Sequence, residues 1–131
     1  MPQWRKYILE VGVGIDLHGQ DVTKAAQRAV KDAISHVSMI GLREILPITR
    51  IEDLDDLLLV DVTIATPFPE KVDRTEVLTI LPEGQRRITV VEGGILYPTP
   101  HNKDLPFIHP VVMAVATVVV LFDIEKSKVT S

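Results

Sequence analysis

The stretch YILEVGVGIDLHG, residues 7–19, decides the fold of this chain. Its hydrophobic residues occupy every second position, and such an alternation predicts a β-strand with one face on a core. We therefore expect a strand from Tyr7 to Leu17 whose odd-numbered residues face the core. The predicted core face holds Tyr7, Leu9, Val11, Val13, Ile15 and Leu17, and the opposite face holds Glu10, Gly12, Gly14, Asp16 and His18.

The residues after this strand have the spacing of an amphipathic helix. Asp21 is a favourable N-cap, and apolar residues recur every three or four positions until Val37, shortly before a helix-ending Gly41. Several of these residues are alanine, so the helix can lie close on a sheet. The predicted apolar stripe consists of Val22, Ala25, Ala26, Ala29, Val30, Ala33, Ile34 and Val37.

Three more strands and one more helix are expected in the rest of the chain. A second helix is expected from Asp73, as N-cap, to Leu81, and the acidic residues 52–56 are expected to form a solvated turn. The strands lie at residues 57–66, 87–97 and 111–124, with a short extended piece at 42–50.

The resulting order, βα(β)βαββ with the short extended piece in parentheses, predicts an α+β fold. The expected architecture is a single mixed or antiparallel sheet of about four strands, with two helices on one face. We expect one domain over residues 1–131, with a flexible tail at 125–131.

Composition and charge exclude several classes of protein. The net charge is −4 and no cluster of Lys and Arg stands out, so no nucleic-acid partner is expected. The absence of cysteine rules out disulfides and fits a reducing compartment, so the expected location is the cytoplasm. The most apolar run, residues 111–122, is shorter than the roughly 20 residues of a membrane-spanning helix, so no membrane partner is expected.

The last strand predicts a homo-oligomer. Its residues are apolar on both faces, whereas two helices can cover only one face of the sheet. A second subunit is expected to cover the other face, because soluble monomers rarely expose a large apolar patch. Closed symmetric assemblies bury such a patch, and a trimer is the favoured state.

The main candidate site is the segment GVGIDLHG, residues 12–19, at the end of the first predicted strand. Asp16 and His18 lie two residues apart on a strand, so both side chains point the same way and could bind a divalent metal ion or exchange a proton. Gly12 and Gly14 leave space on that face for a ligand or another backbone, and Gly19 follows. The alternative is structural: the glycines allow tight packing at a subunit interface, and Asp16 and His18 form a hydrogen-bonded pair.

A second candidate is Glu92, followed by Gly93 and Gly94. The glycines allow another close approach by a ligand, with Glu92 as an acid, base or metal ligand. A β-bulge is the alternative interpretation of the two glycines.

The remaining histidines are weaker candidates for completing the site. His36 lies at the edge of the helical apolar stripe, which favours a core or interface position over a ligand. His101 and His109 flank a proline-rich loop and are candidates to close over a neighbouring subunit's site.

The motif Gly12-Val13-Gly14-Ile15-Asp16-Leu17-His18-Gly19 resembles the GxGxDxHG signature of the lin-zero-five-one-two family of conserved hypothetical proteins. The resemblance covers nearly the whole chain, including VVEGG at residues 90–94 and the apolar last strand. Because the family has no established activity, the resemblance carries no reaction over to this chain.

A more distant resemblance is to methylerythritol cyclodiphosphate synthase, a trimeric enzyme. Its first strand ends in a similar GxDxH segment that supplies an aspartate and a histidine to a divalent metal. The resemblance implies that Asp16 and His18 are metal ligands. The enzyme's third ligand is a histidine just before its first long helix, where this chain has Gln20 and Asp21.

The expected architecture also resembles cyanuric acid hydrolase and barbiturase, which look like three α+β units around a pseudo-threefold axis. This resemblance implies a homotrimer and, as a further alternative function, a cyclic amide hydrolase-like enzyme. The catalytic serines of those enzymes have no counterpart beside Gly93 and Gly94, where Glu92 stands.

Two main hypotheses about function follow. The first is a metal-assisted enzyme for a small polar molecule, with its site at the GVGIDLHG strand end in a subunit interface and with Asp16, His18 and Glu92 as catalytic residues. The second is a non-catalytic oligomer that binds a metabolite or a partner in the same groove.

Overall fold

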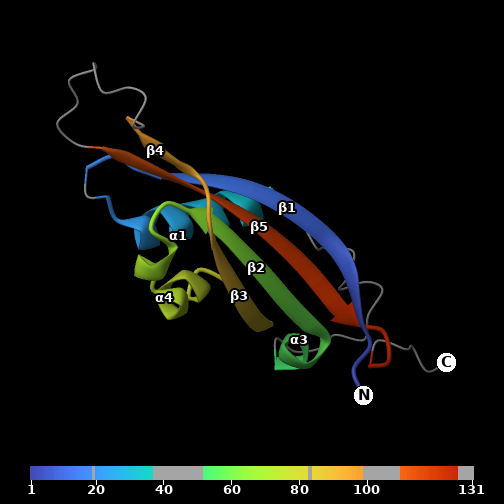
Figure 1. The fold of residues 1–131 in the computed structure, drawn as a ribbon. Coiled ribbons are helices and arrows are strands. Elements are labelled where there is room, and N and C mark those ends of the chain that lie inside the picture. The colour runs from blue at the N-terminus through green and yellow to red at the C-terminus, as the bar shows by residue number, and fades with distance from the viewer. Residues whose placement is uncertain (19, 37–51, 83, 99–109, 127–131) are drawn as a thin grey trace.

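A computed structural model describes residues 1–18, 20–36, 52–82, 84–98 and 110–126, and its fold is α+β, as the sequence predicted (Figure 1). The predicted extended piece at 42–50 lies outside these residues, as does most of the predicted tail. The elements are β1 (Trp4–Asp16), α1 (Val22–Ser35), α3 (Glu52–Leu57), β2 (Leu58–Thr66), the 3-10 helix η1 (Pro69–Lys71), α4 (Arg74–Leu78), β3 (Gln85–Glu92), β4 (Ile95–Tyr97) and β5 (Val111–Asp123).

Two local predictions need correction. The acidic residues 52–56 form most of the short helix α3, not a turn. The carboxylate of Asp55 accepts a hydrogen bond from the Gly84 backbone N–H at 3.1 Å, and its carbonyl accepts one from the Gln85 side chain at 2.9 Å. The end of α3 is thereby fastened to the start of β3. The strand predicted at 87–97 is divided into β3 and β4 at Gly93 and Gly94.

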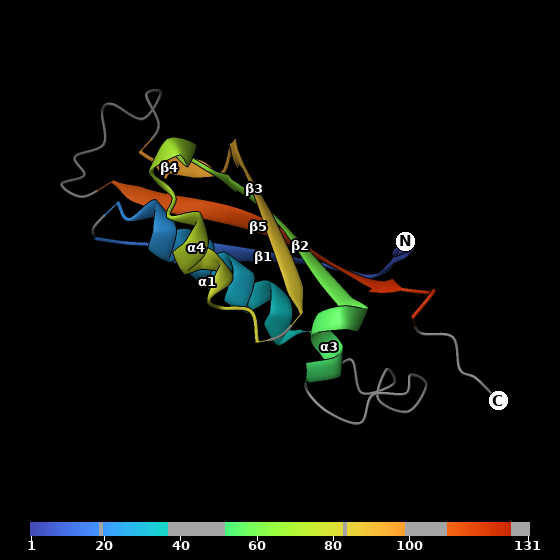
Figure 2. The same cartoon turned by 90° about the horizontal axis from the view of Figure 1, so that it is seen from below.

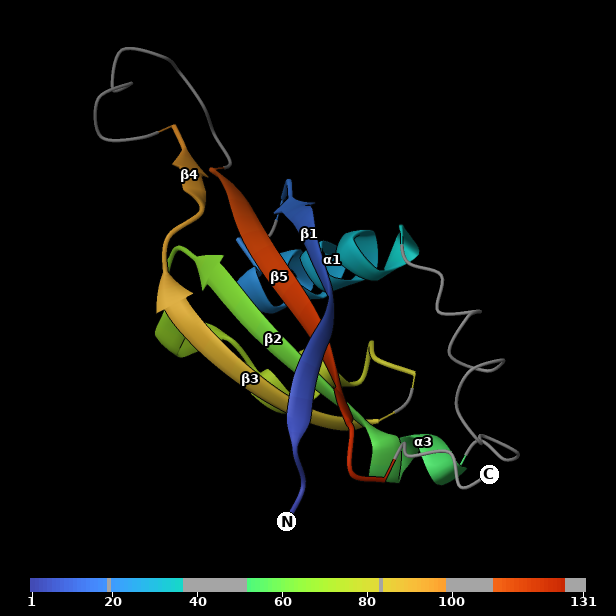
Figure 3. The ribbon, with the colours of Figure 1, turned by 90° about the vertical axis from the view of Figure 1, so that its right-hand side faces the viewer.

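One mixed sheet contains all five strands, in the order β1-β5-β2-β3, with β4 beside β5 (Figure 3). Strand β5 is antiparallel to both β1 and β2, whereas β2 and β3 are parallel. Beyond the end of β2, strand β4 continues as the neighbour of β5, with Leu96 opposite Val112. The apolar strand β5 is therefore paired on both edges, as its hydrophobic sequence favours.

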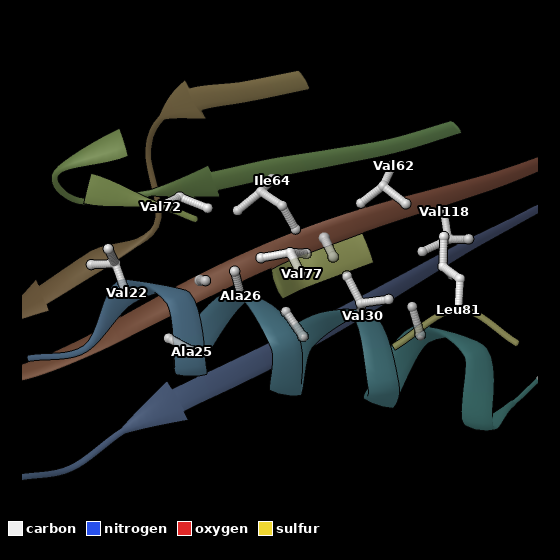
Figure 4. Close-up of a cluster of buried hydrophobic side chains, with 14 of the residues drawn as sticks. Val22, Ala25, Ala26, Val30, Val62, Ile64, Val72, Val77, Leu81 and Val118 are labelled. Carbon is white, nitrogen blue, oxygen red and sulfur yellow. The ribbon is translucent and has the colours of Figure 1, made fainter. Parts of the chain in front are cut away.

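Helices α1 and α4 cover one face of this sheet (Figure 2). Asp21 is the N-cap of α1 and Asp73 is the N-cap of α4, as predicted, and each carboxylate accepts a backbone N–H at 3.1 Å. Among the described helices, none is long and apolar enough to cross a membrane. The core between helices and sheet includes Val22, Ala26, Val30, Val62, Ile64, Val77 and Val118 (Figure 4).

The prediction of which face of β1 meets the core was wrong. The odd-numbered residues are exposed: Leu9 is 63% exposed, and Val11 and Val13 are each 50% exposed. Helix α1 lies instead on the face that carries Gly12 and Gly14, which are buried. The alternation of β1 separates two faces, but the helix packs on the one with the smaller side chains because its own stripe of alanines requires close contact.

The carboxylate of Asp123, at the end of β5, binds the residue before β1 and a residue after β5. It makes the stability of the fold depend on pH. It accepts hydrogen bonds from the backbone N–H groups of Gln3, at 2.9 Å, and Glu125, at 3.0 Å. The Gln3 N–H, followed by that of Glu125, holds the pKa of Asp123 below its ordinary value of 3.8. The resulting stabilisation is complete above the ordinary pKa and is lost as the pH falls through the lower, folded-state pKa.

We expect Asp123→Asn to be less stable at pH 7 and to lose less stability than the wild type between about pH 4 and pH 2. Asparagine keeps an oxygen acceptor but has no charge to lose. Urea unfolding at a series of pH values measures this difference. Asp56→Asn, at an exposed ion pair with Lys126, is the control and should follow the wild-type profile. An unchanged acid profile in Asp123→Asn would contradict the assignment.

Candidate functional site

Asp16 is the last residue of β1, and its side chain is directed to the helix-covered face, where it is 11% exposed. One carboxylate oxygen accepts the Asp21 backbone N–H at 2.8 Å, and the other lies 3.3 Å from Nη1 of Arg28. Asp21 is the N-cap of α1, and Arg28 lies in the middle of the helix. Asp16 therefore connects the end of β1 to the helix that follows it.

His18 lies beyond the strand, in an exposed bend. Because β1 ends at Asp16, the alternation that was expected to aim His18 along the same face does not extend to it. Gly19 lies outside the described residues. Within the described ranges, no group of three or more His, Asp or Glu side chains is arranged to hold a metal ion. Shared metal binding by Asp16 and His18 stays a prediction.

Gly12 and Gly14 lie directly beneath α1. A Cβ atom on Gly12 would overlap the carbonyl of Ala29 and the backbone nitrogen of Ala33, and one on Gly14 would overlap the carbonyl of Ala25. The backbone that approaches these glycines is thus the chain's own helix. Gly12 faces Ala29 and Ala33, and Gly14 faces Ala25 and Ala29, which are one helical turn apart. The strand and the helix are therefore in contact along their backbones.

We expect Gly14→Ala to destabilise the fold by about 3 kcal/mol, at the upper end of the usual cost of overpacking, because the overlapping atoms are helix backbone and cannot rotate away. Urea unfolding gives the free-energy change. Arg5→Ala, at an exposed position of the same strand, is the control and should stay within about 0.5 kcal/mol of the wild type. A Gly14→Ala protein as stable as this control would show that α1 is free to shift.

Glu92 lies at the exposed end of β3, opposite Thr66 of β2. Since β5 and β2 separate β1 from β3, Glu92 is three strand spacings, or about 14 Å, from the β1 strand. The structure therefore does not bring Glu92 together with Asp16.

The two glycines after Glu92 allow the chain to cross from β3 to β4. Gly94 has a φ of +65° and leaves no room for a Cβ beside the carbonyl of Met113, while a Cβ on Gly93 would lie 2.9 Å from that of Ala65. The close approach predicted for these glycines is an approach to the chain's own backbone at Gly94 and to the Ala65 side chain at Gly93.

Sequence reasoning missed two side chains of α1 that cover the free edge of β1. Asp32 accepts the Val13 backbone N–H at 3.0 Å, and Arg28 donates to the Ile15 carbonyl at 2.6 Å. The Val13 N–H, with a smaller contribution from His36, lowers the pKa of Asp32. His36 is exposed and lies 3.4 Å from Asp32, so it has an edge position and not a core one. The available signal was the four-residue spacing of Arg28 and Asp32 beside the alanine stripe.

The other face of the sheet, which we call the open face, has none of the described helices over it (Figures 1 and 3). Its β3 side is polar, with an ion pair of 3.1 Å between Arg87 and Asp61. Its β1 side is apolar. The exposed large hydrophobic residues of β1 and the residue after it are Tyr7, Leu9, Val11, Val13, Ile15 and Leu17, and Val91 and Ile95 are exposed on β3 and β4.

These features define an α+β protein with α1 and α4 on one face of a mixed sheet and an opposite face that is apolar on its β1 side and that no described helix covers. The chain belongs to the family described as Conserved hypothetical protein (Lin0512_fam), whose model matches residues 6–120. This membership agrees with the resemblance carried by the GVGIDLHG segment.

The chain is also similar to a solved crystal structure, that of an FtsZ-like protein of unknown function from Nostoc punctiforme PCC 73102. The two share 34% sequence identity with a TM-score of 0.76, and the match covers 94% of this chain and 99% of the other. A comparison with curated proteins found no match.

Proposed function

We propose that this protein acts as a homotrimer that packs through the open face and binds a small molecule or a partner in the groove between subunits, beside the end of β1. The observation that carries the proposal is a row of exposed hydrophobic side chains beside a sheet face that no described helix covers: Tyr7, Leu9, Val11, Val13 and Ile15 of β1, with Leu17 just beyond the strand. A second copy of the chain is the occupant to which we commit.

The size of the open face supports self-association. From Tyr7 to Leu17 the chain spans about 33 Å, and four paired strands are about 19 Å wide, so the open face has an outline of roughly 600 Å². Its β1 side is apolar and its β3 side is polar, so only about half of this outline is an apolar patch. The whole face approaches the roughly 800 Å² that each partner contributes to a standard stable interface, since side chains make the accessible area larger than the outline.

The protection of the β1 edge supports packing by the face and not by strand addition. Asp32 and Arg28 already occupy the Val13 N–H and the Ile15 carbonyl, both of which point outward from the sheet. An incoming strand would have to displace them. The hydrophobic side chains perpendicular to the sheet have no such cover, so association through them needs no rearrangement of the protomer.

The threefold stoichiometry and the groove rest on different support. A trimer is what the resemblance to methylerythritol cyclodiphosphate synthase and to the pseudo-threefold hydrolases implies. Leu17 and His18 are exposed immediately beyond the apolar side of β1. Because they adjoin the face that a neighbour would cover, a groove between subunits would have them at its rim.

We expect the wild type to have a solution mass near three times 14.6 kDa at micromolar concentration. Val11→Asp should shift the protein to smaller species, because it would bury an unpaired charge in the interface. Size-exclusion chromatography with light scattering measures the mass, and circular dichroism checks folding. Thr75→Glu adds the same charge at an exposed position on α4 and should remain trimeric.

A wild-type monomer at micromolar concentration would contradict the proposal independently of any variant. A folded Val11→Asp protein that assembles as well as Thr75→Glu would remove the open face from the interface. A wild-type dimer would contradict the threefold symmetry.

The second candidate function is a small-molecule enzyme in which His18 acts as acid or base. The exposure of His18 beside the open face favours it. Asp16 is less suited to be a metal ligand or a base, because its carboxylate already accepts the Asp21 N–H and pairs with Arg28. Asp16 instead fixes the turn that carries His18.

For the enzyme candidate, we expect His18→Ala to reduce turnover by about 10²- to 10⁴-fold, the usual contribution of a general acid or base. The measurement is a screen of small polar substrates, with and without added Zn²⁺, Mn²⁺ or Mg²⁺, on protein purified without a histidine tag. His36→Ala, at another exposed histidine, should retain full turnover. Absence of turnover throughout the screen would favour the non-catalytic binding function.

A further inference from the structure

A groove of about 250 Å³ lies along the outer side of α1. Helix α1 is on the side of the sheet opposite the open face (Figure 2). Four residues of α1 line it, Lys24, Gln27, Arg28 and Lys31, and Ile80, which follows α4, forms an apolar wall. The four helical residues recur at spacings of three and four, so they lie on one side of the helix. The groove is smaller than the cavities that hold drug-sized ligands, about 300–1,000 Å³, and suits a compact ligand.

The two walls of the groove are held together by hydrogen bonds between α1 and α4. The Gln27 side-chain amide donates to the Glu76 carbonyl at 2.9 Å, and the Asp73 backbone N–H donates to the Thr23 hydroxyl at 2.9 Å. Ile80 packs against the core cluster. The groove is therefore a feature of the packed structure and does not depend on a loop outside the described residues.

The charge of the groove is positive and largely uncompensated. Arg28 pairs with Asp16, but Lys24 and Lys31 form no ion pair with any residue that the structure describes. The two lysines are seven residues apart, which places them about 10 Å apart along the helix axis, with Arg28 between them. On a chain whose net charge is −4, this is a local concentration of positive charge in which neither lysine has an ion-pair partner among the described residues.

We propose that this groove binds a small molecule that carries a phosphate monoester and a compact apolar body. Lysine ammonium groups and the arginine guanidinium are the usual donors to phosphate oxygens. Ile80 would contact the apolar part, and a dianion would compensate the charges of Lys24 and Lys31. Asp16 and the Ile15 carbonyl hold Nη1 of Arg28 at the edge of β1, so Lys24 and Lys31 would make the main contacts with the phosphate.

The competing interpretation is that the lysines belong to an ordinary solvated helix surface. Such a surface attracts all anions weakly and without preference for an apolar body. The two interpretations differ in whether binding depends on these particular lysines and on the phosphate group.

The test is a titration of the full-length, isotope-labelled protein with phenyl phosphate in phosphate-free buffer, followed by NMR chemical shifts. We expect saturable shifts in the amides of α1 and around Ile80, and an affinity at least tenfold weaker in the double variant Lys24→Gln/Lys31→Gln. Neither lysine has an ion-pair partner among the described residues, so this variant should fold normally. Lys6→Gln/Lys71→Gln removes the same charge elsewhere and should bind as the wild type does.

Three results would overturn the proposal. The first is an equal loss of affinity in both double variants. The second is that phenol binds as tightly as phenyl phosphate. The third is that succinate binds as tightly, which would show that the groove accepts any dianion and does not select phosphate. The groove and the open face lie on opposite sides of the sheet, so loss of assembly in Val11→Asp leaves this test unaffected, and failure of phosphate binding leaves the trimer unaffected.

Discussion

The rest of the structure depends on the close contact between the backbone of β1 and the backbone of α1. Gly12 and Gly14 have no side chains to separate them from the helix, and the helix presents Ala25, Ala29 and Ala33, all fully buried. Contact of this kind gains dispersion energy from backbone atoms on both sides and leaves no void. It also fixes the helix along the strand, because two glycines and three alanines accommodate each other in only one alignment.

This contact determines which face of the sheet is left uncovered. Once α1 occupies the glycine face, the large side chains of β1, such as Leu9 and Val11, must point away from α1 and α4. The most hydrophobic face of the strand is thus free for association, while the least hydrophobic one is used for folding. The same contact brings Arg28 to the end of β1, where it meets Asp16 and the Ile15 carbonyl.

Most elements could be predicted from the sequence, because alternation, helical spacing and the N-caps Asp21 and Asp73 are local signals. The covered face of β1 could not be predicted from hydrophobicity, since the choice is made by fit against α1 and not by the strand alone. The role of Asp16 was also out of reach, because its partners come from α1 and its N-cap turn, and a two-residue spacing on a strand says nothing about them. The distance between Glu92 and Asp16 depends on strand order, which brings β5 and β2 between them.

The free edge of β1 explains why an apolar strand of this length can be tolerated at the side of a sheet. Exposed hydrophobic edges promote open-ended pairing between chains. Here the register of β1 shifts between Lys6 and Ile8, which interrupts the edge near its start, and Asp32 and Arg28 occupy it at Val13 and Ile15. The side chains that hinder edge pairing, Asp32 and Arg28, also stabilise the packing of α1 against β1. What remains for association is the open face, and such a face can be buried in a closed assembly.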